Sequence, residues 1–143
     1  MTYPVTLSES LAIQSAKVFT ADSYGATLTF DKINQSVAHI NMGTQGGTTV
    51  TLYQSTVTPI TDKDAATSKV ITGKTLTWAD GDDDIPGAIN VKAEELDNAG
   101  GYKYWTWYAD VTSTSTGGIT VVGADARYGP ASDQNMTDTK VVK

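Results

Sequence analysis

One short segment, residues 102–108, constrains the fold more than any other part of the chain. It reads Tyr-Lys-Tyr-Trp-Thr-Trp-Tyr, so five of its seven residues are aromatic. Because side chains alternate across a β-strand, Trp105 and Trp107 fall on one face and the tyrosines on the other. The segment predicts a strand that continues to Thr112, with one face in a core. Its second face is either covered by a neighbouring sheet or presented to a ligand or partner.

The rest of the chain also favours short strands. Twenty-three of the 143 residues are threonine, which is β-branched and suits the water-facing side of a sheet. Residues 36–42 and 48–55 alternate between apolar and polar, and the glycine-containing segment 43–47 between them predicts a β-hairpin. Ala38, Ile40, Met42, Val50 and Leu52 are expected to point inward. Residues 119–128 are expected to return, after a turn at Gly117-Gly118, as the hairpin partner of 102–112.

These segments, with shorter ones at 17–20, 27–33, 69–71, 74–78 and 89–93, predict an all-β fold. We expect a single antiparallel β-sandwich of about seven or eight short strands, with terminal arms. The sandwich is expected to span residues 17–130, with an N-terminal arm at 1–16 and a C-terminal tail at 131–143. Gly73 is expected to interrupt a strand by a turn or a bulge, and Leu96 to anchor a helical or 3₁₀ turn at 94–98.

Charge and composition disfavour several classes of function. The net charge is −6, and the ten basic residues are spread along the chain, so nucleic-acid binding is not expected. No segment has the composition of a secretory signal or the length of a membrane span, so we expect a protein made in the cytoplasm without membrane insertion. The chain has no cysteine, which removes thiolate metal sites and cysteine nucleophiles.

The residues that could carry chemistry do not combine into a motif. The acidic loop 80–84 fails the EF-hand spacing in both registers, so a solvated acidic turn is preferred over a looser cation site. His39 is the only histidine and is expected on a strand at or near the surface. Glu94, Glu95 and Asp97 lie on a turn without a fixed separation for paired carboxylates. We therefore expect no enzyme, no catalytic residue, no metal site and no cofactor.

Three segments of the C-terminal half follow one another in a characteristic order. Residues 89–97 read Ile-Asn-Val-Lys-Ala-Glu-Glu-Leu-Asp, residues 101–104 read Gly-Tyr-Lys-Tyr, and residues 119–128 end in Arg-Tyr and precede Pro130. This order resembles small tailed-bacteriophage virion proteins encoded among the head genes, over roughly residues 17–130. The resemblance implies a capsid decoration (cement) protein in the virion, bound to the capsid exterior.

The resemblance also implies partners. The major capsid protein would be the lattice partner, and self-association, for example as a trimer, is expected. The expected interface comprises the N-terminal arm and the aromatic strand: Leu7, Leu11, Ile13, Tyr102, Tyr104, Trp105, Trp107 and Tyr108. Two alternatives stay open. One is a carbohydrate-binding module, with Trp78, Trp105 and Trp107 as the sugar platform, or an adhesin-type domain of a tail or fibre, which rests on the threonine-rich sheet. The other is a head–tail completion protein.

Overall fold

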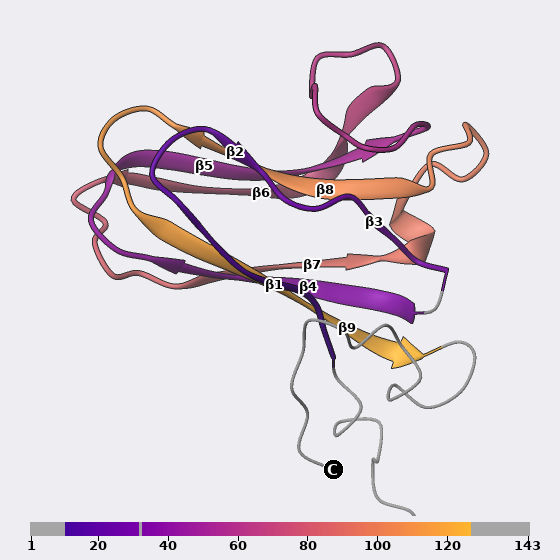
Figure 1. Ribbon diagram of the computed structural model, residues 1–143, viewed down its shortest axis with the longest axis horizontal. Helices are drawn as coiled ribbons and strands as arrows, with labels where there is room; N and C mark the ends of the chain where they lie inside the picture. Colours follow the sequence, from indigo (N-terminus) through magenta and orange to yellow (C-terminus); the bar gives the residue numbers. More distant parts are fainter. Residues whose placement is uncertain (1–10, 32, 127–143) are drawn as a thin grey trace, which may run out of the picture.

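Two antiparallel sheets lie face to face in the computed structural model, which describes residues 11–31 and 33–126 (Figure 1). The first, called here the β4–β9 sheet, has the order β1 (Leu11–Phe19), β9 (Gly117–Ala126), β4 (Ile33–Met42) and β7 (Gly87–Lys92). The second, the β5–β8 sheet, has the order β2 (Ser23–Tyr24), β8 (Tyr104–Val111), β5 (Gly46–Ser55) and β6 (Ser68–Asp80). β3 (Leu28–Thr29) also pairs with β8. The prediction of an all-β antiparallel sandwich is confirmed.

The strand order is that of a jelly roll. β2 and β3 both pair with β8 and act as one interrupted strand, which gives two four-stranded layers. Chain connections cross between the sheets after β1, β4, β6 and β8 at one end, and after β3 and β7 at the other (Figure 1). The β5–β6 connection stays within one sheet. Jelly rolls of this kind close two Greek keys around a single core.

Both predicted hairpins are wrong. β4 pairs with β7 and β9, whereas β5 pairs with β6 and β8, so these consecutive strands lie in opposite sheets. β8 and β9 are separated in the same way. Apolar alternation indicates which face of a strand is buried but not which strand lies beside it. The glycine-containing loops are long enough to cross the roughly 10 Å between packed sheets, so they join layers and do not form hairpins.

The predicted N-terminal arm is also wrong for residues 11–16. These residues belong to β1, which pairs antiparallel with β9 from Leu11 to Phe19. The register of this pairing shifts between Ala12 and Gln14 and again between Gln14 and Lys17. Such irregularities break the period-two pattern by which a strand is recognised in a sequence. Residues 1–10 and the predicted tail at 131–143 lie outside the described residues.

The core is built on the two tryptophans of β8. Trp105 and Trp107 are fully buried, and Phe30 stacks on Trp105 with ring centroids 5.6 Å apart. Gly25 passes so close to Trp107 that a Cβ there would lie 2.4 Å from the indole nitrogen. This contact explains why the segment between β2 and β3 needs glycine at this position. The residues expected to point inward from β4 and β5 are buried: Ala38, Ile40, Met42, Val50 and Leu52.

Two local predictions in the middle of the chain are confirmed. β6 is one strand of 13 residues, and Gly73 within it has φ +75° beside a register shift in the pairing with β5. A glycine accepts this left-handed conformation without steric cost, so the bulge sits there. The turn after β7 is a 3₁₀ helix, η1 (Ala93–Glu95), and Leu96 behind it is buried in the core.

Ion pairs join the two sheets at the edge formed by β6 and η1. The Lys74 ammonium lies 2.8 Å from a carboxylate oxygen of Glu95, and Lys69 pairs with Asp97. Burial acts to raise the pKa of Glu95, but hydrogen bonds from the Lys74 side chain and the Lys92 backbone outweigh it and lower that pKa. Hydrogen bonds from Lys69 and from the backbone of Gly100 lower the pKa of Asp97. β6 is thus tied to the loop that follows β7.

These lowered carboxyl pKa values predict a loss of stability in acid. A carboxylate whose pKa is lowered by folding stabilises the protein above its unfolded-state pKa of about 4, and this contribution disappears as the pH falls through the folded-state value. We expect the urea midpoint to fall between pH 7 and pH 3, and Glu95→Gln to make this fall smaller. Glu94→Gln removes a carboxylate from the same turn whose contact with Lys92 is 3.9 Å long, and serves as the control. If the urea midpoints of Glu95→Gln and Glu94→Gln fell equally with pH, the assignment of this stability to Glu95 would be contradicted.

A second prediction concerns a buried hydroxyl in β5. Thr48 is 1% exposed, and its hydroxyl has no hydrogen-bond partner among the described residues. A buried polar group without a partner costs on the order of 1–3 kcal/mol. Thr48→Val keeps the shape and removes this cost, so we expect the free energy of unfolding to rise by about 1 kcal/mol in chemical denaturation. A decrease would mean that the hydroxyl is hydrogen-bonded in solution.

Candidate functional site

The aromatic strand does not present its tryptophans. Trp105 and Trp107 are fully buried and Trp78 is 4% exposed, so the predictions that Trp105 and Trp107 form part of an exposed interface and that the three make a sugar platform are wrong. The physical reason is that β8 is a central strand, flanked by β5 on one side and by β2 and β3 on the other. Of the alternatives considered for this strand, the one with both faces covered is correct.

The outer face of β8 is covered by two segments from elsewhere in the chain. The Thr106 hydroxyl donates to the carbonyl of Ala26, which holds the segment between β2 and β3 over the strand. The loop 56–67 between β5 and β6 contributes Ile60, which is 3% exposed and whose N–H donates to the Thr27 hydroxyl. Sequence alternation shows neither covering segment, because both are irregular.

The other residues of the expected interface occupy different places. Tyr102 and Tyr104 are partly buried near the start of β8, where Lys69 lies 4.1 Å from the Tyr102 ring centroid. Leu11 and Ile13 lie in β1, at the edge of the β4–β9 sheet. Leu7 lies outside the described residues. The structure therefore does not gather these residues into one surface.

A tyrosine cluster that the sequence did not indicate lies on the outer side of the β5–β8 sheet. The Tyr24 and Tyr108 ring centroids are 4.6 Å apart, and the Tyr53 ring meets Tyr108 edge-on at 6.2 Å. The three come from β2, β5 and β8, which are far apart in sequence. Their only sequence signal is that each stands in a short alternating stretch, which does not reveal that they meet.

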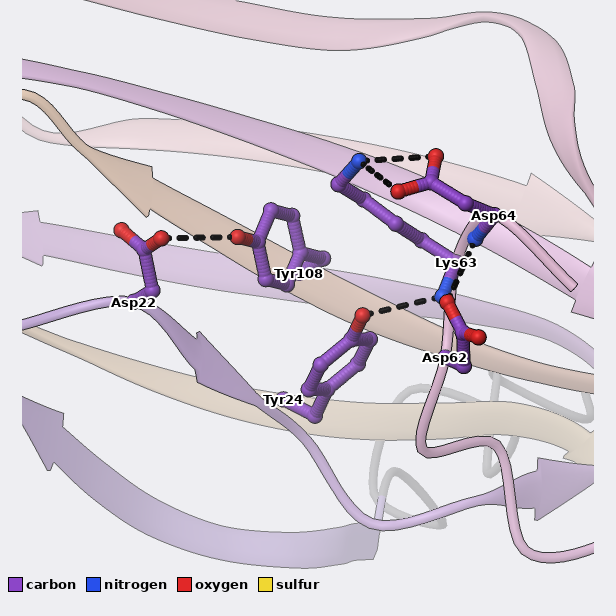
Figure 2. A network of polar contacts seen from close by, with 6 residues as sticks. All are labelled: Asp22, Tyr24, Asp62, Lys63, Asp64 and Tyr108. Atoms are coloured by element: carbon purple, nitrogen blue, oxygen red, sulfur yellow. Dashed lines mark hydrogen bonds and ion pairs between the residues drawn. The ribbon is translucent and has the colours of Figure 1, made fainter.

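Polar contacts fix this cluster to the loop 56–67 and to the turn before β2 (Figure 2). The Tyr108 hydroxyl donates to Asp22 at 3.0 Å, while the Lys63 N–H donates to the Tyr24 hydroxyl at 2.9 Å. The Lys63 ammonium pairs with Asp64 at 2.7 Å, and this hydrogen bond raises the pKa of Lys63. Burial, and then the hydrogen bond to Asp22, raise the pKa of Tyr108.

Because its polar groups are engaged within the protein, we assign the cluster to holding the loop over the sheet. The raised Tyr108 pKa gives a test. A tyrosine that stays protonated longer in the folded state contributes stability below its unfolded pKa of about 10, and that contribution is lost as the pH rises toward the folded value. Burial also raises the pKa of Tyr53, so in an ultraviolet alkaline titration we expect the latest of the tyrosine steps to be the one that Tyr108→Phe removes. Tyr102→Phe is the matched control, and an unchanged latest step in Tyr108→Phe would contradict the assignment.

The outer face of the β4–β9 sheet differs in composition. Burial alternates from Ser36 to Met42 in β4, along β7, and from Gly117 to Gly123 in β9, so the outward positions of these stretches are clear, and Gln35 before them is exposed. At the described positions these residues form what we call the neutral face: Val18, Gln35, Val37, His39, Asn41, Ala88, Asn90, Lys92, Gly118, Thr120 and Val122. Cross-strand pairs such as Val37–Val122 and His39–Ala88 place them side by side.

The neutral face contains no aspartate or glutamate, although the chain carries 16 acidic residues. The acidic side chains that the structure describes lie instead in the loop 80–84, in η1 and its flank, around the tyrosine cluster, and at Asp31 between β3 and β4. Removing ionised carboxylates from water is costly, and interface cores are accordingly depleted of charge. Val18 on this face is also 73% exposed. Of the two sheet surfaces, the neutral face is therefore the one that costs less desolvation free energy to bury against a partner.

The acidic loop and the histidine behave as solvated features. Asp83 accepts a hydrogen bond from the backbone N–H of Gln45, and Asp82 accepts one from that of Ala79, so two of the loop carboxylates hold the turn. His39 is exposed on β4, as predicted. Among the described residues, no group of three or more potential metal-ligating side chains comes together, and no helix is long and apolar enough to cross a membrane.

Comparison with known proteins adds no relative. No protein family model matches the chain, and neither a curated protein nor a solved structure is similar to it at a significant level. The jelly-roll sandwich and its two contrasting faces are therefore the observations on which a function can be argued.

Proposed function

We propose that this chain is a structural virion protein, a capsid decoration (cement) protein that docks on the outer surface of a tailed-phage head and stabilises it. The major capsid protein would be its partner, and self-association, for example as a trimer, belongs to the same proposal. The observation that carries the docking mode is the absence of carboxylates from the described outward positions of the β4–β9 sheet, in a chain of net charge −6. The resemblance of residues 17–130 to phage head proteins supplies the partner.

The geometry of the neutral face fits a lattice contact. Four strands spaced about 4.8 Å apart, with outward residues over about 20 Å along β4, make a flat patch of roughly 400 Å². A stable interface buries about 800 Å² on each partner, so the patch alone would bind weakly. Repetition over a symmetric shell compensates for a weak single contact, because every linked copy raises the effective concentration of the next.

The fold and the places of the first and last described residues are consistent with docking through the neutral face. Jelly rolls recur among viral capsid proteins and lectins, which gives the proposal support at the level of architecture only. The described chain begins at Leu11 and ends at Ala126, both in the β4–β9 sheet. Leu11 pairs with Gly123, so the two ends leave from neighbouring strands. The first and last described residues therefore both lie in the sheet that carries the neutral face.

The carbohydrate-binding alternative loses the residues on which it rested, because all three tryptophans are buried. The head–tail completion and fibre alternatives are distinguished from decoration by the site of attachment. A decoration protein binds at many equivalent positions of the shell, whereas a completion protein binds at one vertex and a fibre protein binds away from the head.

The test is co-sedimentation with emptied heads of the phage that encodes this chain. We expect saturable binding with many copies per head, and loss of binding in the double variant His39→Glu/Ala88→Glu, which places carboxylates at two exposed, paired positions of the neutral face. Each added charge must be desolvated on docking, so we expect affinity to fall at least tenfold.

The matched control is Thr75→Glu/Thr77→Glu, at two exposed positions on β6 in the other sheet. It adds the same charge to the opposite side of the molecule and should bind as the unaltered protein does. Equal binding by both double variants would overturn the assignment of the neutral face. Absence of binding by the unaltered protein would overturn the decoration proposal itself.

A further inference from the structure

An open cleft of about 690 Å³ lies at the end of the sandwich where β3 leads into β4 and β7 leads into η1. Its volume falls within the roughly 300–1,000 Å³ typical of small-molecule sites. Phe30, Ala93 and Leu96 form its apolar lining. The polar side chains around them are Asp31, Asn34, Gln35, Lys92, Glu94, Asn98 and Lys103.

One wall of this cleft is held in place by its own hydrogen bonds. The Asn98 side-chain amide donates to the carbonyls of Ala93 and Leu96, at 3.1 and 3.2 Å. Glu95 accepts from the backbone N–H of Lys92 at 2.8 Å, which fixes the start of η1. Phe30, on the opposite side, is stacked on the buried Trp105 ring. A lining that is already ordered loses little conformational entropy when a ligand binds.

The charges in the cleft balance. The lining contains two ammonium groups, those of Lys92 and Lys103, and two carboxylates, those of Asp31 and Glu94. Lys92 and Glu94 are 3.9 Å apart, a contact long enough for both to bind other groups, and the Asp31 carboxylate accepts the Thr29 hydroxyl. Three amide side chains, Asn34, Gln35 and Asn98, complete the lining. Ammonium groups only donate hydrogen bonds, carboxylates only accept them, and amides do both.

We propose that this cleft is a binding site for a neutral, polyhydroxylated ligand, a saccharide of one or two rings. Vicinal hydroxyls both donate and accept hydrogen bonds, so they match a lining that supplies both kinds of group. The balanced charge gives no advantage to an anion or a cation. The site is distinct from the buried tryptophans, although Gln35 and Lys92 also belong to the neutral face.

The experiment is a titration of the ¹⁵N-labelled full chain with cellobiose, maltose and N,N′-diacetylchitobiose, followed by amide chemical shifts. We expect at least one disaccharide to give saturable shifts that cluster at residues 30–35, 92–98 and 103. Asp31→Ala and Lys103→Ala, two positions outside the neutral face, should each weaken that binding about tenfold, the loss of about 1.4 kcal/mol. Asp110→Ala, an exposed aspartate on β8, is the matched control and should leave binding unchanged.

Three outcomes would overturn the proposal. Absence of saturable shifts with all three disaccharides would remove the site. Shifts of equal size on both sheet faces, unaffected by Asp31→Ala, would show non-specific contact. Tighter binding of glucuronate or glucosamine than of the neutral sugars would contradict the charge-balanced ligand class. None of these results bears on head binding, so the two proposals fail separately.

Discussion

The structure depends on the closure of two sheets over the inward face of β8. Trp105 and Trp107 are the largest fully buried side chains, and aromatic side chains of this size bury roughly 150–250 Å² each. Burying both of them requires a second layer on the inner side of β8, which β4 and β9 supply. The connections that cross between the sheets build this layer, because they place strands that follow one another in the chain on opposite walls of the same core, whereas β2–β3 and β5–β6 stay within one sheet. One outer face is covered by a loop that the tyrosines hold in place, and the other is exposed and has no carboxylate at its described positions.

The sequence was sufficient for the fold class and for the direction of many side chains. Alternation in β4 and β5 correctly places Ile40 and Leu52 in the core, and Gly73 correctly marks a bulge. It was insufficient for strand pairing, because a glycine-containing loop of five residues fits a hairpin and a crossing between sheets equally well. It was also insufficient for β1, whose register shifts remove the period that makes a strand visible. These errors are of topology, and topology is decided by contacts between residues distant in sequence.

The candidate surface was misplaced for a related reason. An aromatic-rich strand suggests an exposed binding platform only when its sheet has a free face, and the segments covering β8 are irregular loops without periodicity. The neutral face could have been found from the sequence in principle, because none of the described outward positions of β4, β7 and β9 is aspartate or glutamate. Likewise, the tyrosine cluster (Figure 2) and the cleft each join residues from separate parts of the chain, so only the folded arrangement brings them together.

We propose that a sandwich built around buried tryptophans docks on a protein lattice through its neutral face. A cryo-electron microscopy reconstruction of decorated heads tests that claim most directly, because it resolves which sheet faces the shell. We predict density at many equivalent positions on the capsid exterior, with the surface containing His39 and Ala88 toward the shell and the Tyr108 cluster toward solvent. Density with the β5–β8 sheet against the shell, or its absence from the head surface, would contradict the account.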